Sequence, residues 1–320
     1  MKNKKCFLLF LVSFGIYISS CQKEINVESG NNPFPPSGNV KDSNYLDKLY
    51  FIDSIAGSKD TLVFYTYLYD TNRRLLNISH YYSHLTSLGP NLSKSQYFFY
   101  NGTDTLPFKR AEYDYEEALF YSSQYLVDTS ISMFKYDGLG RKTFDSTHET
   151  DHFDFAGSNG VEFRKIISHF SYNARNVYVQ KTATRLGGTN PVVYSNTFTD
   201  TAFFDATDNL ISLKSYGSIM PGMYILGTFT YDNHPSPFAK LSNFASLDFF
   251  KTSELFWPLL QSRNNPQLVL SEIIGGSGGF YQDYTNMYTY NTDGYPLRIV
   301  QPDSLGGPNY YITEFKYRKL

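Results

Sequence analysis

A short alternating pattern of aromatic residues recurs along most of the chain. Each copy holds an aromatic residue, any residue, a second aromatic residue and then Asp or Asn. Clear copies begin at Tyr67, Phe98, Phe134, Phe170, Phe229 and Tyr288; a copy at Ala202 lacks the first ring, and a half-copy begins at Phe315. Because residues two apart on a β-strand share a face, both rings of a copy are predicted to point into the fold.

The Asp or Asn after the second ring predicts a turn. Its side chain can accept hydrogen bonds from backbone N–H groups ahead of it, which favours a type I turn. Three positions later, Gly140, Asn176 and Gly294 can adopt the positive φ that closes a hairpin with a bulge. Apolar segments then follow at 75–78, 177–179, 210–213 and 297–299. Each copy therefore predicts a β-hairpin.

These units predict an all-β fold of sequential antiparallel hairpins in one large twisted sheet. Two strands per unit give roughly 14 to 18 strands, with consecutive strands as neighbours. Such a sheet can close as an open barrel or as a sandwich. Residues 247–260 break the rhythm, because their apolar residues follow a helical spacing up to Pro258. A short helix or a long loop is expected there.

The chain is rich in aromatic residues, with 29 Tyr and 27 Phe against one Trp. Rings inside the repeat are predicted to form the core, whereas rings outside it are candidates for exposure. The neighbours Tyr81 and Tyr82 must place one ring on each face of a strand. Exposed rings can stack on sugars or meet a protein partner. Tyr81, Tyr82 and Trp257 are therefore the candidate ligand-binding residues.

The first 21 residues have the layout of a secretory signal peptide. A basic start at Lys2, Lys4 and Lys5 precedes an apolar run over 6–18, which is shorter than the roughly 20 residues of a spanning helix. The end, Ile18-Ser19-Ser20-Cys21, is similar to the lipobox of bacterial lipoproteins, in which the cysteine is acylated. This resemblance implies lipidation of Cys21 and anchoring to outer-membrane lipid.

Three regions follow from these patterns. Residues 1–20 are predicted to be the lipoprotein signal peptide. Residues 21–39 are predicted to be a flexible tether, because Gly, Asn and Pro punctuate them. Residues 40–320 are predicted to form a single all-β repeat domain.

Composition and motifs exclude several kinds of chemistry. Cys6 and Cys21 are the only cysteines, so the mature fold is expected to lack disulfides and thiolate sites. The net charge of −2 gives no footprint for nucleic acid. Gly275 to Gly279 match the sequence pattern of a nucleophile elbow, but that mechanism needs a His later in the chain and no His follows His234.

Metal and carboxylate sites are not predicted either. The pairs His80 with His84 and His148 with His152 are explained as polar positions on strands, because zinc catalysis needs three ligands and a second shell. No carboxylate pair is nominated; Asp145, Asp154 and Glu162 merely lie near apolar strands. The sequence predicts no catalytic residue, no metal and no cofactor.

Two resemblances bear on class. Residues 134–142 (FKYDGLGRK) resemble the YD repeat of Rhs-type proteins, a hairpin strung into a long winding sheet. The segments YDNHPSPF from Tyr231, SRNNP from Ser262 and YTYNTDGYP from Tyr288 resemble uncharacterised Bacteroidetes lipoproteins with a domain of unknown function. The likeness implies an all-β fold, a lipid anchor and an envelope location, but no reaction and no site residues.

The sequence thus predicts a lipid-anchored protein of the outer membrane whose barrel or sandwich is a non-enzymatic binding or scaffolding module. Glycan or another envelope protein is the expected partner. Two alternatives stay open: a glycan-active hydrolase with carboxylates distant in sequence, and a purely structural envelope module. Whether the domain faces the periplasm or the cell surface stays open as well.

Overall fold

The structure is a computed structural model of the whole chain. It describes residues 44–55, 58–82, 91–115, 128–155, 158–186, 194–215, 224–238, 262–274, 281–302 and 310–320, and every structural statement refers to these. The predicted signal peptide and tether with Cys21, the segment 247–260 with Trp257, and the glycine-rich stretch 275–279 lie outside the described residues.

All described elements are strands. They are β1 (Asn44–Ile55), β2 (Ser58–Tyr69), β3 (Leu75–Tyr82), β4 (Asn91–Phe99), β5 (Lys109–Asp114), β6 (Asp128–Tyr136), β7 (Lys142–Phe155), β8 (Ser158–Asn173), β9 (Asn176–Leu186), β10 (Tyr194–Phe204), β11 (Leu210–Ser215), β12 (Tyr224–Pro235), β13 (Asn264–Ile274), β14 (Tyr281–Thr285), β15 (Met287–Tyr290), β16 (Pro296–Pro302) and β17 (Tyr310–Lys319). The predicted all-β class is confirmed.

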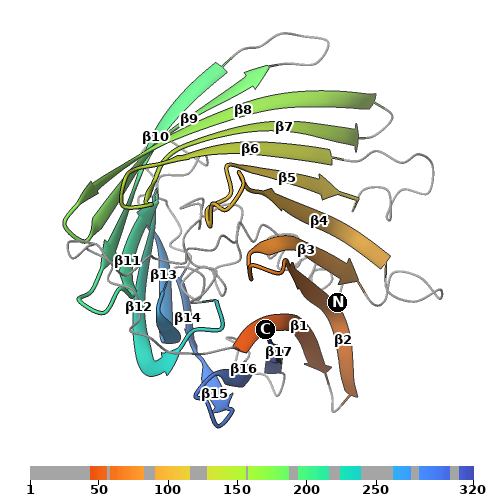
Figure 1. Ribbon diagram of the computed structural model, residues 1–320, viewed down its shortest axis with the longest axis vertical. Coiled ribbons are helices and arrows are strands. Elements are labelled where there is room, and N and C mark those ends of the chain that lie inside the picture. Colours follow the sequence, from red (N-terminus) through yellow and green to blue (C-terminus); the bar gives the residue numbers. More distant parts are fainter. Residues whose placement is uncertain are drawn as a thin grey trace.

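The strands follow one another around a nearly closed barrel (Figure 1). Each pairs antiparallel with the strand before it, and β1 closes the ring by pairing with both β2 and β17. β14 and β15 form one strand interrupted at Asn286, so the barrel has 16 antiparallel strands. Of the two predicted ways to close the sheet, the structure has the barrel.

The Asp/Asn turns have the predicted geometry. Asp137 accepts hydrogen bonds through one carboxylate oxygen from the backbone N–H groups of Leu139 and Arg141, both at 2.9 Å. The fourth residue, Gly140, has φ +72° and donates its N–H to the Asp137 carbonyl oxygen at 2.9 Å. The same bonds recur in the turns that begin at Asp70, Asp205 and Asn291.

One turn prediction is wrong. Asn176 does not adopt positive φ; Ala174 does, at +50°. Asn173 pairs directly with Asn176, so the connection between β8 and β9 is a two-residue loop rather than a bulged one. Two other turns place the non-glycine residues Arg73 and Asp208 at positive φ, at +64° and +65°.

The ring pairs point inward as predicted. The first ring of most copies is buried, and in six copies the hydroxyl of the second, a tyrosine, donates to a backbone carbonyl oxygen near the start of an earlier strand. These bonds join Tyr69 to Leu46, Tyr100 to Leu75, Tyr136 to Pro107, Tyr172 to Lys142, Tyr231 to Leu210 and Tyr317 to Pro296, at 2.5–3.0 Å. Burial raises the pKa of these hydroxyls in Tyr69, Tyr172 and Tyr231, which keeps them protonated as donors.

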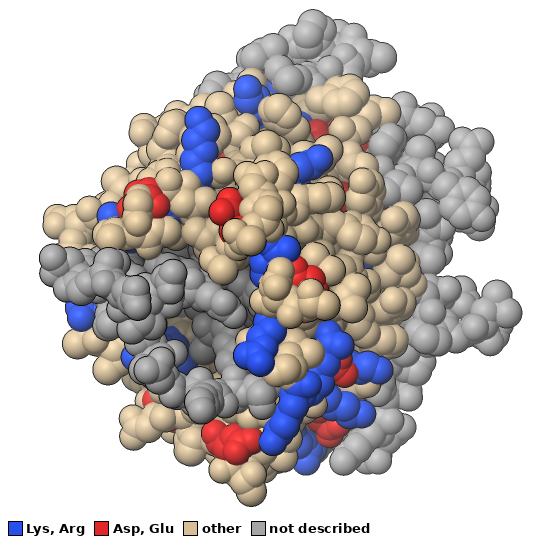
Figure 2. Space-filling model, viewed as in Figure 1, with Lys and Arg blue, Asp and Glu red and all other residues tan. Residues whose placement is uncertain are grey.

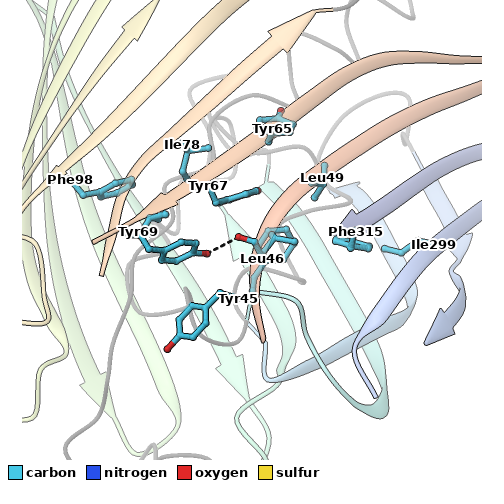
Figure 3. Packing of buried hydrophobic residues seen from close by; sticks show 12 residues of the cluster. Tyr45, Leu46, Leu49, Tyr65, Tyr67, Tyr69, Ile78, Phe98, Ile299 and Phe315 are labelled. Carbon is cyan, nitrogen blue, oxygen red and sulfur yellow. Dashed lines mark hydrogen bonds between the residues drawn. The ribbon is translucent and has the colours of Figure 1, made fainter. Parts of the chain in front are cut away.

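Two apolar clusters fill part of the interior. The first gathers residues of β1 to β4, β16 and β17, among them the fully buried Leu49 and Leu75 (Figure 3). The second gathers residues of β9 to β13 around Leu213 and Phe229. Between them, the inner faces of β4 to β8 carry mainly polar side chains, which is the feature that sets up the candidate sites.

Candidate binding surfaces on the barrel wall

Strands β4, β5 and β6 have the reverse of the usual polarity, with apolar side chains outside and polar ones inside. On β6, Ser130, Ser132 and Phe134 are buried while Ile131 and Met133 between them are exposed. The outward side chains Tyr97, Phe99, Tyr113, Ile131 and Met133 are each 36–44% exposed. We call these five residues the outer patch.

Cross-strand register makes the outer patch continuous. Tyr97 on β4 and Ile131 on β6 both pair with Ala111 on β5, and Phe99 and Met133 both pair with Lys109. The Tyr97 and Tyr113 rings meet edge to face with centroids 6.0 Å apart, and Lys109 Nζ lies 5.1 Å from the centre of the Phe99 ring. Large apolar groups this exposed and this close together are typical of an interaction surface.

The apolar character does not extend around the barrel. Outward positions of β7 to β10 are mainly polar, although the side chains of Phe163 on β8 and Phe203 on β10 are exposed. The polar ones include His148, Lys165, His169, Gln180, Thr197 and Thr199. A lipid-facing Lys at mid-bilayer costs about 2–4 kcal/mol, so this wall is suited to water. Acidic and basic side chains lie interspersed on the face seen in Figure 2.

None of the described segments forms a helix of the length and apolar character needed to cross a bilayer.

The inner wall of β4 to β10 is lined with ion pairs. Lys94 lies 2.6 Å from Asp114 and 3.8 Å from Glu112, and both Lys94 and Glu112 are almost fully buried. The further inward pairs are Lys142 with Asp145, Lys181 with Asp200, Arg164 with Glu149, Asp151 and Glu162, and Arg185 with Glu162. Buried charges are tolerated when paired in this way.

A hydrogen-bonded chain connects Arg110 on β5 to the Lys142–Asp145 pair through Ser132 on β6 and Thr147 on β7. Arg110 Nη2 donates to Ser132 Oγ at 3.0 Å, and Ser132 Oγ lies 2.8 Å from Thr147 Oγ1. Thr147 donates to Asp145 Oδ1 at 2.9 Å, and Lys142 Nζ lies 3.3 Å from the other oxygen of Asp145. Asp145 and Glu162, which the sequence does not nominate as catalytic, are paired with basic side chains; the side chain of Asp154 is not described.

His80 lies on the inner wall, where its Nδ1 is 2.5 Å from Ser93 Oγ and its ring stacks on Tyr65. Burial, and to a smaller extent the charge of Lys94, lowers the pKa of His80 well below its ordinary value. His148 is instead exposed on the outer wall, and His84 and the side chain of His152 are not described. Among the described residues, no group of three or more His, Cys, Asp or Glu is placed to hold a metal ion.

The structure describes the ring of one sequence-predicted ligand residue. Tyr81 lies on the outer wall of β3, half-buried, with its ring stacked on Phe64 at 4.7 Å between centroids. Phe64 stacks in turn on Tyr50 at 5.9 Å, and Lys316 Nζ lies 4.8 Å from the Tyr50 ring centre. Tyr81 therefore belongs to a row of stacked rings. The backbone of Tyr82 lies in β3, but its side chain is not described.

Sequence reasoning missed the outer patch, although the signal for it was present. Once Phe98 and Tyr100 are assigned to the inside, Tyr97 and Phe99 must point outward. The same parity places Met133 and Ile131 outside when Phe134 is inside. The polar inner residues follow from this parity too, but their pairing partners depend on strand register.

Comparisons with known proteins found similarity to solved structures alone among the three kinds of comparison. No protein-family model matches the chain, and no curated protein matches it. A porin-like protein from Bacteroides vulgatus superposes with a TM-score of 0.49 at 12% identity, covering 87% of this chain and all of that one. A porin-like protein from Bacteroides uniformis gives 0.46 at 14% identity, covering 85% of this chain and 98% of that one.

Proposed function

We propose that the protein is a lipid-anchored component of the outer membrane, tethered through acylated Cys21, whose barrel stands in water as a non-enzymatic binding module. The partner we propose is another envelope protein, bound at the outer patch of β4 to β6. The observation that carries the proposal is the gathering of five exposed large apolar side chains on three adjacent strands.

The polar remainder of the outer wall supports a barrel in water. A membrane-spanning barrel needs an apolar band about 25 Å tall on every lipid-facing strand. The middle of β8 presents Lys165 outward, and its register partners His148 and Thr184 are polar as well. An apolar patch confined to part of the wall is instead suited to a contact of limited area.

The composition of the outer patch favours a protein over a glycan. Aromatic residues and Met are enriched at protein interfaces, and charged residues are depleted at their centres. Ile131 and Met133 supply aliphatic surface on the strand next to Tyr113, and Lys109 Nζ lies over the Phe99 ring. A sugar-binding site would instead rely on ring faces alone.

The test compares a triple variant of the outer patch with a double variant on another part of the wall. Tyr97→Ser, Ile131→Ser and Met133→Ser together remove the centre of the outer patch; Met287→Ser and Leu297→Ser remove equally exposed apolar groups from β15 and β16. Cross-linking in intact envelopes, followed by mass spectrometry, measures which proteins attach to each variant. We expect the triple variant to lose a cross-linked protein that the wild type and the double variant retain.

Two results would count against this proposal. If the triple variant keeps every cross-linked protein of the wild type, the outer patch is not the binding surface. If it loses retention on envelope polysaccharide instead, the partner is a glycan. The anchor is tested separately, because Cys21→Ala is expected to move the protein from the membrane fraction to the soluble one.

A further inference from the structure

Two lysines face each other directly on the outer wall, close to the first residue of the barrel. Lys48 on β1 pairs in register with Lys316 on β17, so both side chains lie on the same face of the sheet. Lys316 is exposed and Lys48 is half-buried. Like charges directly opposite each other on neighbouring strands destabilise a sheet. The fold therefore loses stability by holding these two ammonium groups in register.

Neither lysine forms an ion pair within the part of the chain that the structure describes. The acidic residue before Lys48, Asp47, pairs with Arg318 at 3.4 Å. Glu314, two residues before Lys316 on the same face of β17, lies opposite a basic residue of β16 in the register of the sheet. The nearby carboxylates thus have other basic neighbours, and the repulsion between the two lysines is left uncompensated.

A second pair of opposed basic residues shows how the inner wall compensates the same repulsion. Arg164 and Arg185 are register partners on β8 and β9, and both form ion pairs with Glu162. Lys316 instead lies over the Tyr50 ring, with Nζ 4.8 Å from the ring centre. This contact holds the ammonium group against the wall but does not neutralise its charge. An anion from outside the chain would remove the repulsion.

The lysine pair lies where the predicted tether joins the barrel. Asn44, the first residue of β1, is four residues from Lys48, or about 13 Å along an extended strand. Residues 22–43 connect Asn44 to Cys21, and a flexible chain of that length has a root-mean-square span of about 25 Å. On the face seen in Figure 2, Lys and Arg are most crowded in the region where Figure 1 places β1, β2 and β17. A membrane that holds the acyl chains of Cys21 is therefore within reach of the pair.

We propose that Lys48 and Lys316 bind phosphate groups of anionic lipid headgroups in the membrane to which the protein is anchored. The inference rests on the proposed acylation of Cys21. Lysine binds phosphate as a point charge, and a phosphate placed between two ammonium groups replaces one repulsion by two attractions. A basic residue close to an anionic membrane surface strengthens binding about fivefold.

Two lysines are sufficient because the tether keeps them near the lipid. A flexible linker gives an effective concentration of about a millimolar, at which contacts that are weak in solution are populated. Without the anchor, the same contact is too weak to retain the protein on a membrane at ordinary salt, where exposed charges are screened. With the anchor, it turns the wall of β1 and β17 towards the bilayer and leaves the outer patch of β4 to β6 available to a protein partner.

The test measures sedimentation of the full-length Cys21→Ala protein with lipid vesicles, because binding without acylation depends on the barrel alone. Phosphatidylcholine vesicles are compared with vesicles that contain about 30 mol% phosphatidylglycerol, at about 25 mM salt. We expect the partition coefficient to be roughly tenfold higher or more for the anionic vesicles. At about 0.5 M salt it should fall to the value for neutral vesicles.

Variants in the Cys21→Ala background separate membrane binding from stability. Lys316→Glu places opposite charges across β1 and β17, so its Tm in buffer should equal or exceed that of the parent, while its partition into anionic vesicles falls about tenfold. Lys48→Gln combined with Lys316→Gln should lose binding to a similar extent. The matched control combines Lys165→Gln with Lys214→Gln, which removes two outward lysines from β8 and β11, and should bind as the parent does.

Equal partition of the parent into neutral and anionic vesicles would overturn the proposal. Binding to anionic vesicles that the Lys48→Gln, Lys316→Gln variant retains would overturn it as well. Inorganic phosphate probes a soluble ligand: a saturable rise of Tm in phosphate over chloride, without vesicle binding, would assign the pair to free phosphate and reject the lipid. The anchor is judged separately, by fractionation of cells that carry Cys21→Ala, so failure of the anchor and failure of the lysine pair can be distinguished.

Discussion

The wall formed by β11 to β13 and the wall formed by β4 to β6 belong to one barrel and are built from the same kind of hairpin, yet their polarity is opposite. The first buries Leu210, Leu213 and Val269 and exposes Thr228 and Thr230, with Ile211 as its exposed large apolar side chain. The second buries charged and hydroxyl side chains and exposes aromatic and aliphatic ones. Both keep the inward tyrosine, Tyr231 on β12 and Tyr136 on β6, whose hydroxyl binds an earlier strand.

The comparison shows that the features that close the barrel are distinct from the side chains that line its two faces. The turns and tyrosine hydroxyl bonds are the same in both walls and depend little on the rest of the strand. Strand interiors are then free to be apolar, where they stabilise the fold, or polar, where they hold charges at fixed positions. The reversed wall buries fewer apolar side chains, and its outer patch is the surface that we propose for the partner.

The largest expected effect is in the ordinary wall. Phe229→Ala removes a buried ring from the cluster around Leu213 and should lower the free energy of unfolding by about 3–5 kcal/mol. Ile131→Ala in the outer patch should change it by no more than about 0.5 kcal/mol, because surface substitutions away from special features have small effects. Urea unfolding followed by circular dichroism measures both values. Equal losses would contradict the division between the two walls.

The next effect concerns the charged interior of the reversed wall. Lys94→Met leaves Glu112 and Asp114 without their shared ammonium group, and breaking a buried pair in this way costs about 3 kcal/mol or more. Lys214→Met is the matched control, because Lys214 points outward from the ordinary wall, beside the Tyr224 ring. A loss for Lys94→Met no larger than that for Lys214→Met would mean that the inner wall is well hydrated and that its charges are weakly coupled.

A smaller and equal effect is expected for the bonds that the walls share. Tyr136→Phe and Tyr231→Phe each remove one hydroxyl that donates to a buried carbonyl oxygen, and each should cost about 1 kcal/mol. Tyr231 also accepts a bond from Ser262 at 2.7 Å, so its cost should lie at the upper end. Stability curves of the two variants that differ by more than about 2 kcal/mol would show that the hydroxyl bonds are not an independent part of the design.

Much of the fold could be predicted because its determinants are local. The spacing of the rings sets the inward face, and Asp137 with Gly140 or Asn291 with Gly294 sets a bulged turn. Arg73 and Asp208 occupy the same turn position with positive φ although they are not glycine, and their residue types do not predict this conformation. The prediction for Asn176 was wrong because a two-residue loop connects β8 and β9. In that loop Ala174, and not Asn176, has positive φ.

The candidate sites depend on register, which the sequence does not display. Placing Tyr97, Ala111 and Ile131 in one row requires the alignment of β4, β5 and β6, and a bulge between His80 and Tyr81 shifts β4 against β3. Parity alone puts Tyr97 and Met133 outside, but it does not show that their strands are neighbours and that their side chains gather in one patch. Tyr81 was selected because its ring lies outside the repeat, a criterion that considers one residue at a time. The outer patch is recognised only when the outward residues of three neighbouring strands are considered together.

The smallest expected effect is a pH dependence that belongs to the reversed wall. The folded-state pKa of His80 is lowered mainly by burial and further by Lys94, whereas in the unfolded chain the pKa returns to about 6.5. Above that pH neither state binds the proton and His80 has no effect. As the pH falls below 6.5 the unfolded state binds a proton that the folded state does not, so stability declines with falling pH.

Replacing His80 by Gln should flatten the decline between about pH 6.5 and 5, measured by urea unfolding at successive pH values. His148→Gln, which removes a histidine from the outer wall of β7, is the matched control for the substitution itself. If the free energy of unfolding of His80→Gln still declines with falling pH as in the wild type, the inner wall near Lys94 admits enough water to solvate a charged imidazole. The inner faces of the two walls would then not differ in hydration as the comparison requires.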